Sequence, residues 1–189
     1  MVSAGVVVIV IVAVVVVILV MAIAVYNRLV RVRNAVDNSW AHIDVQLNRR
    51  HDLVPNLVAT VQGYATHEQS TLAAVTQART AAASALEPAE RAQAENALTG
   101  TLKSLFAVAE AYPDLKANQN FLQLQDQLAD AENRIAYSRQ AYNDAIMTYN
   151  NAIQTFPADI VAGLTGFKAR EPFHMDEDDD GPVHVTFPS

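Results

Sequence analysis

The chain has 189 residues, a net charge of −7 and no cysteine. The lack of cysteine excludes disulfides and a lipidated cysteine anchor, and nothing requires an oxidising compartment. The acidic balance has the wrong sign for contact with a nucleic-acid backbone, so no nucleic-acid partner is expected.

Residues 2–25 carry no charged side chain and consist mainly of Val, Ile, Ala and Leu. A helix of this length spans about 36 Å, enough to cross a hydrocarbon core of about 30 Å. The alternative is a cleaved signal peptide, since Ala22-Ile23-Ala24 resembles a cleavage site. No Lys or Arg precedes the run, however, and it exceeds the usual signal-peptide core of about 7–15 residues. We therefore predict an uncleaved transmembrane anchor over residues 1–25, embedded in a lipid bilayer.

Four interfacial or basic residues follow the apolar run directly: Tyr26, Arg28, Arg31 and Arg33. Tyr is enriched at membrane interfaces, and Arg next to a span favours the cytoplasmic side. The pattern predicts a single pass, with the N-terminus outside and the rest of the chain in the cytoplasm. The three Arg either serve only to fix this topology or also contact anionic lipid headgroups.

Beyond the anchor, apolar residues recur at steps of three and four, the pattern of helices with one buried face. The predicted helices lie at residues 27–64, 67–86, 88–112 and 121–156. Thr66 is the predicted cap of the second helix, and Pro113 and Pro157 end the third and fourth. Short connections predict an antiparallel up-and-down four-helix bundle over residues 26–157, so the predicted fold class is all-α.

Pro55 lies inside the first of these helices. A proline cannot donate the hydrogen bond to the residue four positions earlier, here His51, and it normally kinks or breaks a helix. The apolar spacing nevertheless stays in phase across the proline. We therefore predict a kinked but continuous helix, with a break at residues 51–53 as the alternative.

Residues 158–189 are predicted to form an irregular C-terminal tail. Residues 158–173 combine apolar side chains with two glycines, which suits a short helix followed by an extended strap. Residues 176–180 are five acidic residues in succession, typical of a solvated, disordered segment. Residues 183–187 are predicted to be disordered, with a short strand on a partner's sheet edge as the alternative.

The sequence contains no phosphate loop, dinucleotide-binding glycine fingerprint or serine elbow. Its five His show no metal-ligand spacing. We therefore expect no catalytic residue, cofactor, metal ion or small-molecule substrate, and we predict that the protein is not an enzyme.

Arg50 and Arg79 fall on the apolar stripes of the first and second predicted helices. A buried Arg is costly unless carboxylates pair with it. The two side chains therefore snorkel to solvent, form an ion-pair network that fixes helix register, or receive an acidic group of a partner. Carboxylates considered as their partners are Asp44, Asp52, Glu68, Glu110 and Glu132. The predicted partner-binding or ion-pair residues are Arg49, Arg50, Asp52, Glu68 and Arg79.

Several motifs resemble the LemA family of bacterial membrane proteins. They are Tyr26-Asn27-Arg28-Leu29-Val30, Trp40, Ile43-Asp44-Val45-Gln46-Leu47, Arg49-Arg50, Asp52-Leu53-Val54-Pro55-Asn56-Leu57, Gly63-Tyr64-Ala65, His67-Glu68, Ala78-Arg79, Tyr142-Asn143, Tyr149-Asn150 and Phe156-Pro157. The resemblance covers residues 5–167 and implies a bacterial plasma-membrane protein with one N-terminal span and a cytoplasmic four-helix bundle. It brings no catalytic residues, and the acidic tail departs from the shared region.

These observations predict a membrane-anchored, non-enzymatic interaction or scaffold protein that presents a helical bundle at the cytoplasmic face. The partner would be another copy of the chain or a membrane enzyme. The alternative function is an adaptor or regulator of a membrane-bound enzyme such as a peptidase, because genes of the resembled family often lie near those of membrane peptidases.

Overall fold

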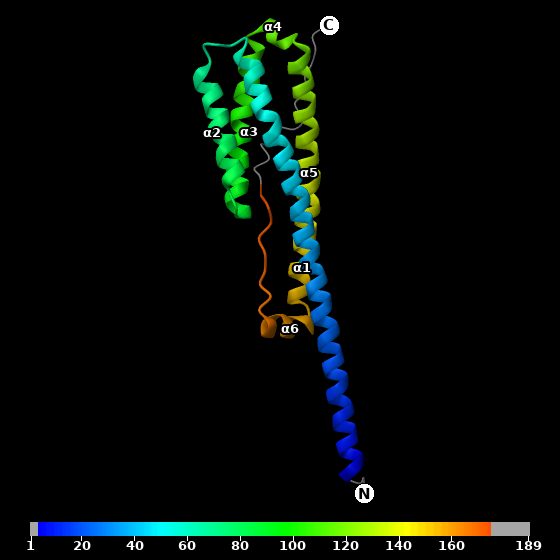
Figure 1. Ribbon diagram of the computed structural model, residues 1–189. Helices are drawn as coiled ribbons and strands as arrows, with labels where there is room; N and C mark the ends of the chain where they lie inside the picture. Colours follow the sequence, from blue (N-terminus) through cyan, green and yellow to red (C-terminus); the bar gives the residue numbers. More distant parts are fainter. Residues whose placement is uncertain (1–3, 175–189) are drawn as a thin grey trace. The chain divides into compact units, whose positions relative to one another are not determined.

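The computed structural model of the protein describes residues 4–174 (Figure 1). Over this range the ordered elements are helices, and no strand is formed. The helices are α1 (Ala4–Gln62), α2 (Gln69–Ser84), α3 (Pro88–Glu110), α4 (Pro113–Lys116), α5 (Gln119–Gln154) and α6 (Ala158–Thr165). The all-α class is confirmed, whereas the antiparallel four-helix arrangement stays a prediction.

The first helix is continuous through its proline. α1 runs for 59 residues with Pro55 inside it, so the predicted continuous helix is confirmed and the break at residues 51–53 is not found. Pro55 leaves the carbonyl of His51 without its usual helical donor. The guanidinium of Arg79 on α2 supplies a replacement, because its Nε donates to the oxygen of His51 at 2.8 Å.

The N-terminal part of α1 is the one stretch in the described chain that is long and apolar enough to cross a membrane, as judged by length and composition. Its large side chains face outwards. Val6, near the start of the run, is 49% exposed, and Ile23, near its end, is 61% exposed. Side chains of this size are normally buried in water-soluble proteins. An apolar solvent around this part of α1 accounts for their exposure.

Two helix boundaries differ from the sequence prediction. Thr66 does not cap α2, because the N-cap position belongs to Glu68. Pro113 does not merely end α3. It occupies the first turn of the short helix α4, where its missing N–H costs nothing. The start of α5 follows at once, where the Oδ1 of Asn118 accepts hydrogen bonds from two backbone N–H groups, at 2.9 and 3.1 Å.

The chain divides into two compact units. Unit 1 contains the described residues up to Asp44 together with Ala136–Pro172. Unit 2 contains Val45–Ile135 together with the described residues from Phe173. Helices α1 and α5 thus contribute residues to both. The predicted division into an anchor, a bundle and a tail, at residues 25 and 157, stays a prediction.

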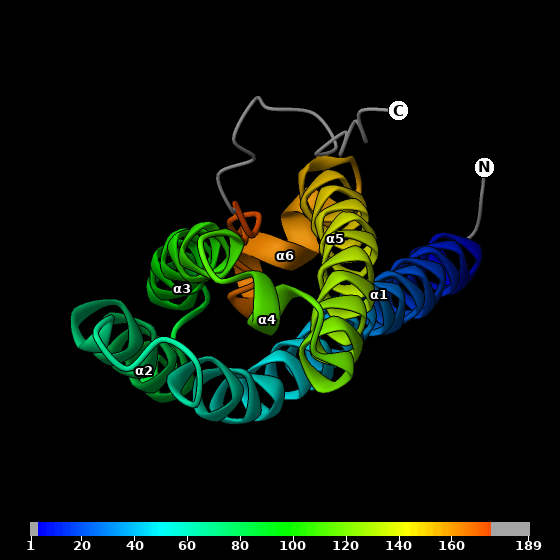
Figure 2. The same cartoon turned by 90° about the horizontal axis from the view of Figure 1, so that it is seen from above.

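Unit 2 has one hydrophobic core, to which α1, α2, α3 and α5 all contribute. Helices α2 and α3 pack side by side (Figures 1 and 2). The core includes Val54, Leu57, Val61, Leu72, Val75, Ala82, Leu98, Leu102, Leu105, Phe121 and Leu128. These are residues of the predicted apolar stripes, so the 3–4 spacing identified most of the buried faces correctly. The prediction is wrong at three helix ends, because Tyr64, Leu86 and Phe156 are exposed and lie beyond the ends of α1, α2 and α5.

Within unit 1, the segment after α6 is fixed along α5. The hydroxyl of Tyr149 donates to the carbonyl of Lys168 at 2.8 Å. The side chain of Asn150 binds the backbone of Arg170 twice, at 2.8 and 3.0 Å. Phe173, the first residue of the chain after unit 1, belongs to unit 2 and is buried. The predicted short helix and extended strap over residues 158–173 are confirmed, while residues 176–180 and 183–187 lie outside the described range.

The contact between Arg79 and His51 predicts a coupling with Pro55. We expect Arg79→Met to lower the free energy of unfolding by about 1.5–3 kcal/mol, the usual value of a hydrogen bond from a charged group. In a Pro55→Ala background the backbone N–H of residue 55 can bind the same carbonyl, so the cost should fall by at least half. Urea unfolding of the full chain in detergent micelles, followed by circular dichroism, measures all four proteins. An equal cost in both backgrounds would contradict the compensation.

Candidate functional site

The centre of unit 2 contains a buried charged network around Arg50. Its side chain on α1 has no exposed surface and lies among α1, α3 and α5. Nη1 donates to Oε1 of Glu132 at 2.6 Å and to the hydroxyl of Thr99 at 3.1 Å. Nη2 donates to Oε2 of Glu95, which is equally buried. The snorkelling interpretation requires the guanidinium to reach solvent. It does not, so this interpretation is wrong for Arg50.

Glu95 on α3 is the acidic centre of this network. Its Oε2 accepts from Arg50, and its Oε1 lies 2.9 Å from Nε2 of His51, which is 3% exposed. Nε of Arg91, one turn earlier on α3, lies 3.9 Å from the same Oε1. Three basic side chains thus surround one buried carboxylate.

Burial works against the charged form of both partners, but the ionic contacts outweigh it. For Glu95, the hydrogen bond from His51 and the charge of Arg50 hold the pKa below its usual value of 4.5. For Arg50, the two glutamates raise the pKa above its ordinary value. Both groups are therefore charged at neutral pH, and each charge is compensated by the other.

Sequence reasoning did not identify Glu95. The stripe of α3 was traced through its apolar members, starting at Leu98, and Glu95 lies one turn before this residue on the same face. The 3–4 spacing continues through Glu95 to Arg91. A charged residue in phase with an apolar stripe was the signal that identified Arg50, and it would also have found this carboxylate.

The remaining predicted site residues do not gather around Arg50. Arg49 is exposed and lies 3.6 Å from Asp130 on α5. Asp52 is exposed, and Glu68 is half-buried at the start of α2, where its Oε1 accepts from the hydroxyl of Tyr112 at 3.4 Å. Arg79 is half-buried and binds the backbone of α1. Among the carboxylates considered as partners, Glu132 does pair with Arg50.

One side of the network opens on the surface of unit 2. The side chain of Glu132 is 40% exposed and lines a groove of about 290 Å³ between α3 and α5. Leu102, Phe106 and Leu128 form part of its apolar wall, and Lys103 is also in its lining. The groove offers an apolar surface with a carboxylate that is already engaged by Arg50. Such a surface suits contact with another protein rather than chemistry on a small molecule.

A second group of predicted residues lies in unit 1, at the end of the apolar run. The ring of Tyr26 meets Phe167 edge-on, with the centroids 5.9 Å apart. The guanidinium of Arg33 lies over the same Phe167 ring, 5.3 Å from its centroid. Arg31 is exposed. Phe167 therefore fixes the segment after α6 against the start of the charged part of α1.

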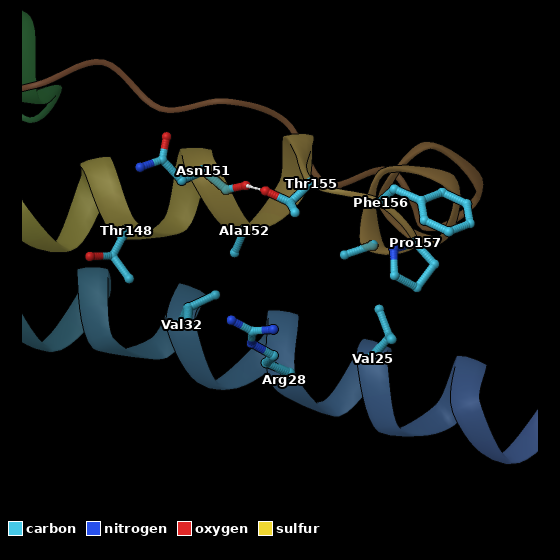
Figure 3. A pocket seen from close by; sticks show the side chains of 10 residues that line it. Val25, Arg28, Val32, Thr148, Asn151, Ala152, Thr155, Phe156 and Pro157 are labelled. Carbon is cyan, nitrogen blue, oxygen red and sulfur yellow. Dashed lines mark hydrogen bonds between the residues drawn. The ribbon is translucent and has the colours of Figure 1, made fainter.

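Arg28 lines a groove of about 300 Å³ between α1 and the end of α5 (Figure 3). Val25 and Val32 on α1 form one wall, and Thr148 and Asn151 on α5 belong to the other. The groove thus combines one cation, several hydrogen-bonding groups and an apolar end beside Val25. This composition matches a lipid, which has an anionic headgroup and an apolar chain.

The fold and the two sites define an all-helical protein with a membrane-type N-terminal helix and a charged network in its packed part. The model of the LemA family matches residues 39–187, and the chain belongs to that family. The resemblance that the sequence motifs indicate is therefore confirmed, but the placement of the acidic residues 176–180 outside the shared region is wrong, because the match includes them. Together with the apolar part of α1, membership makes this a helical, membrane-associated protein.

Relatives of two kinds are similar to the chain. Magnetosome protein MamQ of Magnetospirillum gryphiswaldense is 28% identical over 184 residues, which cover 84% of this chain and 68% of the relative. Magnetosome protein MamQ 2 of Paramagnetospirillum magneticum has the same identity and coverage. Protein LemA of Metamycoplasma hominis is 29% identical over 140 residues, which cover 72% of this chain and 63% of the relative.

The buried network predicts that Arg50→Met is strongly destabilising, although it adds an apolar side chain. The substitution leaves Glu95 buried without its main counter-charge, and breaking a buried pair in this way costs about 3–5 kcal/mol. We expect the double variant Arg50→Met with Glu95→Leu to recover much of this loss. Unfolding of the full-length variants in micelles measures the coupling, and a double variant no more stable than Arg50→Met would contradict it.

Acid titration of the same proteins provides the control. Because the pKa of Glu95 is lowered on folding, its stabilising contribution is complete above the ordinary value of 4.5 and is lost as the pH falls below it. The wild-type protein should therefore lose stability below this pH. The double variant Arg50→Met with Glu95→Leu should show a weaker dependence, and an unchanged dependence would assign the loss to other carboxylates.

Proposed function

We propose that the protein is a membrane-anchored, non-enzymatic scaffold that presents a helical bundle for protein contacts at the cytoplasmic face of a bacterial plasma membrane. The observation that carries the proposal is the continuity of α1. One helix without a break includes the apolar run, Arg28 and the buried Arg50. The proposed anchor and the charged network are thus parts of one continuous helix.

The proposed bundle is an antiparallel arrangement of α1, α2, α3 and α5. Two features support it: the four helices share the core of unit 2, and the connections between them are short. The network supports one alignment of the helices along their axes, since Arg50 on α1 binds Glu95 on α3 and Glu132 on α5. A shift of one helix by a turn would leave at least one of these charges buried without a partner.

The proposed orientation has the N-terminus outside and the packed helices in the cytoplasm. Its support is the placement of Arg28, Arg31 and Arg33 directly after the apolar run, on the side where basic residues are retained. We propose that these Arg, with Tyr26, also contact lipid headgroups. The relatives named as magnetosome proteins support a membrane-associated role.

Orientation is testable because the chain has no cysteine. We expect a membrane-impermeant maleimide to label Ser3→Cys in intact cells and to label Ser104→Cys, an exposed position on α3, only after lysis. Each variant is the other's control, since both replace serine and carry the only thiol of the chain. Labelling of Ser104→Cys in intact cells would overturn the cytoplasmic placement.

The scaffold function predicts a specific partner, recovered when the tagged full chain is purified gently from its native membrane and analysed by mass spectrometry and native mass measurement. We expect a second copy, or a membrane protein other than a peptidase, in fixed ratio. The groove that Glu132 lines is the proposed contact surface. Gln125→Arg, at this groove, should remove most of the partner, because it places an unpaired cation against the apolar wall.

Gln123→Arg is the matched control. It makes the same substitution on α5, at an exposed position that lines a different groove, beside Asn56 and Thr60. A chain recovered only as a monomer would contradict the scaffold function. A partner lost equally in both variants would contradict the groove as its binding surface. Recovery of a membrane peptidase in fixed ratio would replace the scaffold with the adaptor function.

A further inference from the structure

Helix α6 buries its two alanines and exposes two large apolar residues. Ala158 and Ala162 are buried, while Ile160 is 54% and Leu164 is 84% exposed. Phe156, which precedes α6, is 76% exposed. The three large residues are spaced four apart, and we call them the α6 apolar face. Large apolar residues are seldom exposed together on one helix of a water-soluble protein.

The groove next to Arg28 shows where the α6 apolar face lies along α1. Pro157 and Ala158, at the start of α6, line this groove together with Val25, the last residue of the apolar run. In Figure 3 the ring of Phe156 points along α1 towards the N-terminal, apolar end of the helix. The face is therefore at the level where the predicted membrane span ends.

The backbone after α6 holds the helix in this position. Gly166 has a φ of 77°, the left-handed conformation in which glycine is favoured, and it ends α6. The N–H of Phe167 then bonds to the carbonyl of Ala162 at 3.1 Å. The ring of Phe167 packs against Tyr26, as described above. Because α6 is held at both ends, it is not free to rotate, and its exposed face points in one direction.

The charges around the α6 apolar face are those of a membrane interface. Arg28, Arg31 and Arg33 on α1 and Lys168 after α6 are basic, and α6 itself carries one acidic residue, Asp159. Helices that lie in the interface plane combine an apolar face with nearby basic residues that meet anionic headgroups. Continuity with the apolar run of α1 favours a lipid surface over a second protein.

We propose that α6 is a second membrane contact, with Phe156, Ile160 and Leu164 inserted into the headgroup region of the bilayer that α1 crosses. This inference rests on the proposed anchoring of α1 in the same bilayer. Two contacts, one spanning and one interfacial, fix the tilt and rotation of α1 in a way that a single span does not.

Fluorescence quenching by labelled lipids tests the contact in the full chain. The protein is reconstituted in vesicles of phosphatidylcholine and phosphatidylglycerol, with an environment-sensitive fluorophore on the single cysteine of Leu164→Cys, Val14→Cys or Ser104→Cys. We expect the Leu164→Cys label to shift to the blue and to lose most of its emission to nitroxide lipids labelled near the glycerol backbone. Val14→Cys should be quenched best by nitroxides at the chain end, and Ser104→Cys by neither.

The three positions separate failure of this inference from failure of the proposed function. Quenching at Val14→Cys without quenching at Leu164→Cys would overturn the α6 contact and leave the anchor intact. A blue-shifted label at Leu164→Cys that lipid nitroxides do not quench would mean that protein covers the face, which also overturns the proposal. Absence of quenching at both positions would contradict the membrane anchor itself.

Discussion

The carboxylate of Glu95 and the guanidinium of Arg50 form the interaction on which the packing of unit 2 depends. Neither side chain has exposed surface, and their charges come from two helices far apart in the sequence. Apolar contacts tolerate small shifts of one helix against another, whereas a buried ion pair does not. Glu132 adds a third helix to the same constraint, since it binds the other nitrogen of Arg50. We propose that the hydrophobic stripes bring the helices together and that the network selects one register among them.

At Pro55, a hydrogen bond of α1 likewise depends on a residue of another helix. Pro55 deprives His51 of a helical hydrogen bond, and Arg79 on α2 restores it. The ring of the same His51 contacts Glu95. The helix break that a proline normally causes is thus avoided by a contact from outside the helix. α1 is continuous through Pro55, and a residue of α2 replaces the hydrogen bond that the proline removes.

Much of the fold follows from the sequence because helical spacing is a local property. The buried faces of α1, α2, α3 and α5 match the predicted stripes, and the boundaries at Pro88 and Pro157 are close to those expected. Arg50 was identified because a charge in an apolar stripe has few acceptable environments. Its main partner was not, because pairing across helices depends on their order and depth of packing. The cap of α2 and the short helix α4 depend on loop geometry, which spacing does not describe.

In both the network and the α6 apolar face, the surroundings of a side chain decide whether its burial or its exposure is favourable. Where the surroundings are protein, a charge can be buried only if opposite charges and hydrogen bonds surround it, and Arg50 meets this condition. Where the surroundings are lipid, a large apolar side chain need not be buried in protein at all. The outward-facing Val and Ile of α1 and the exposed Leu164 of α6 then have the same explanation. Exposed apolar side chains are unfavourable in water, so they indicate the part of the chain that contacts the bilayer.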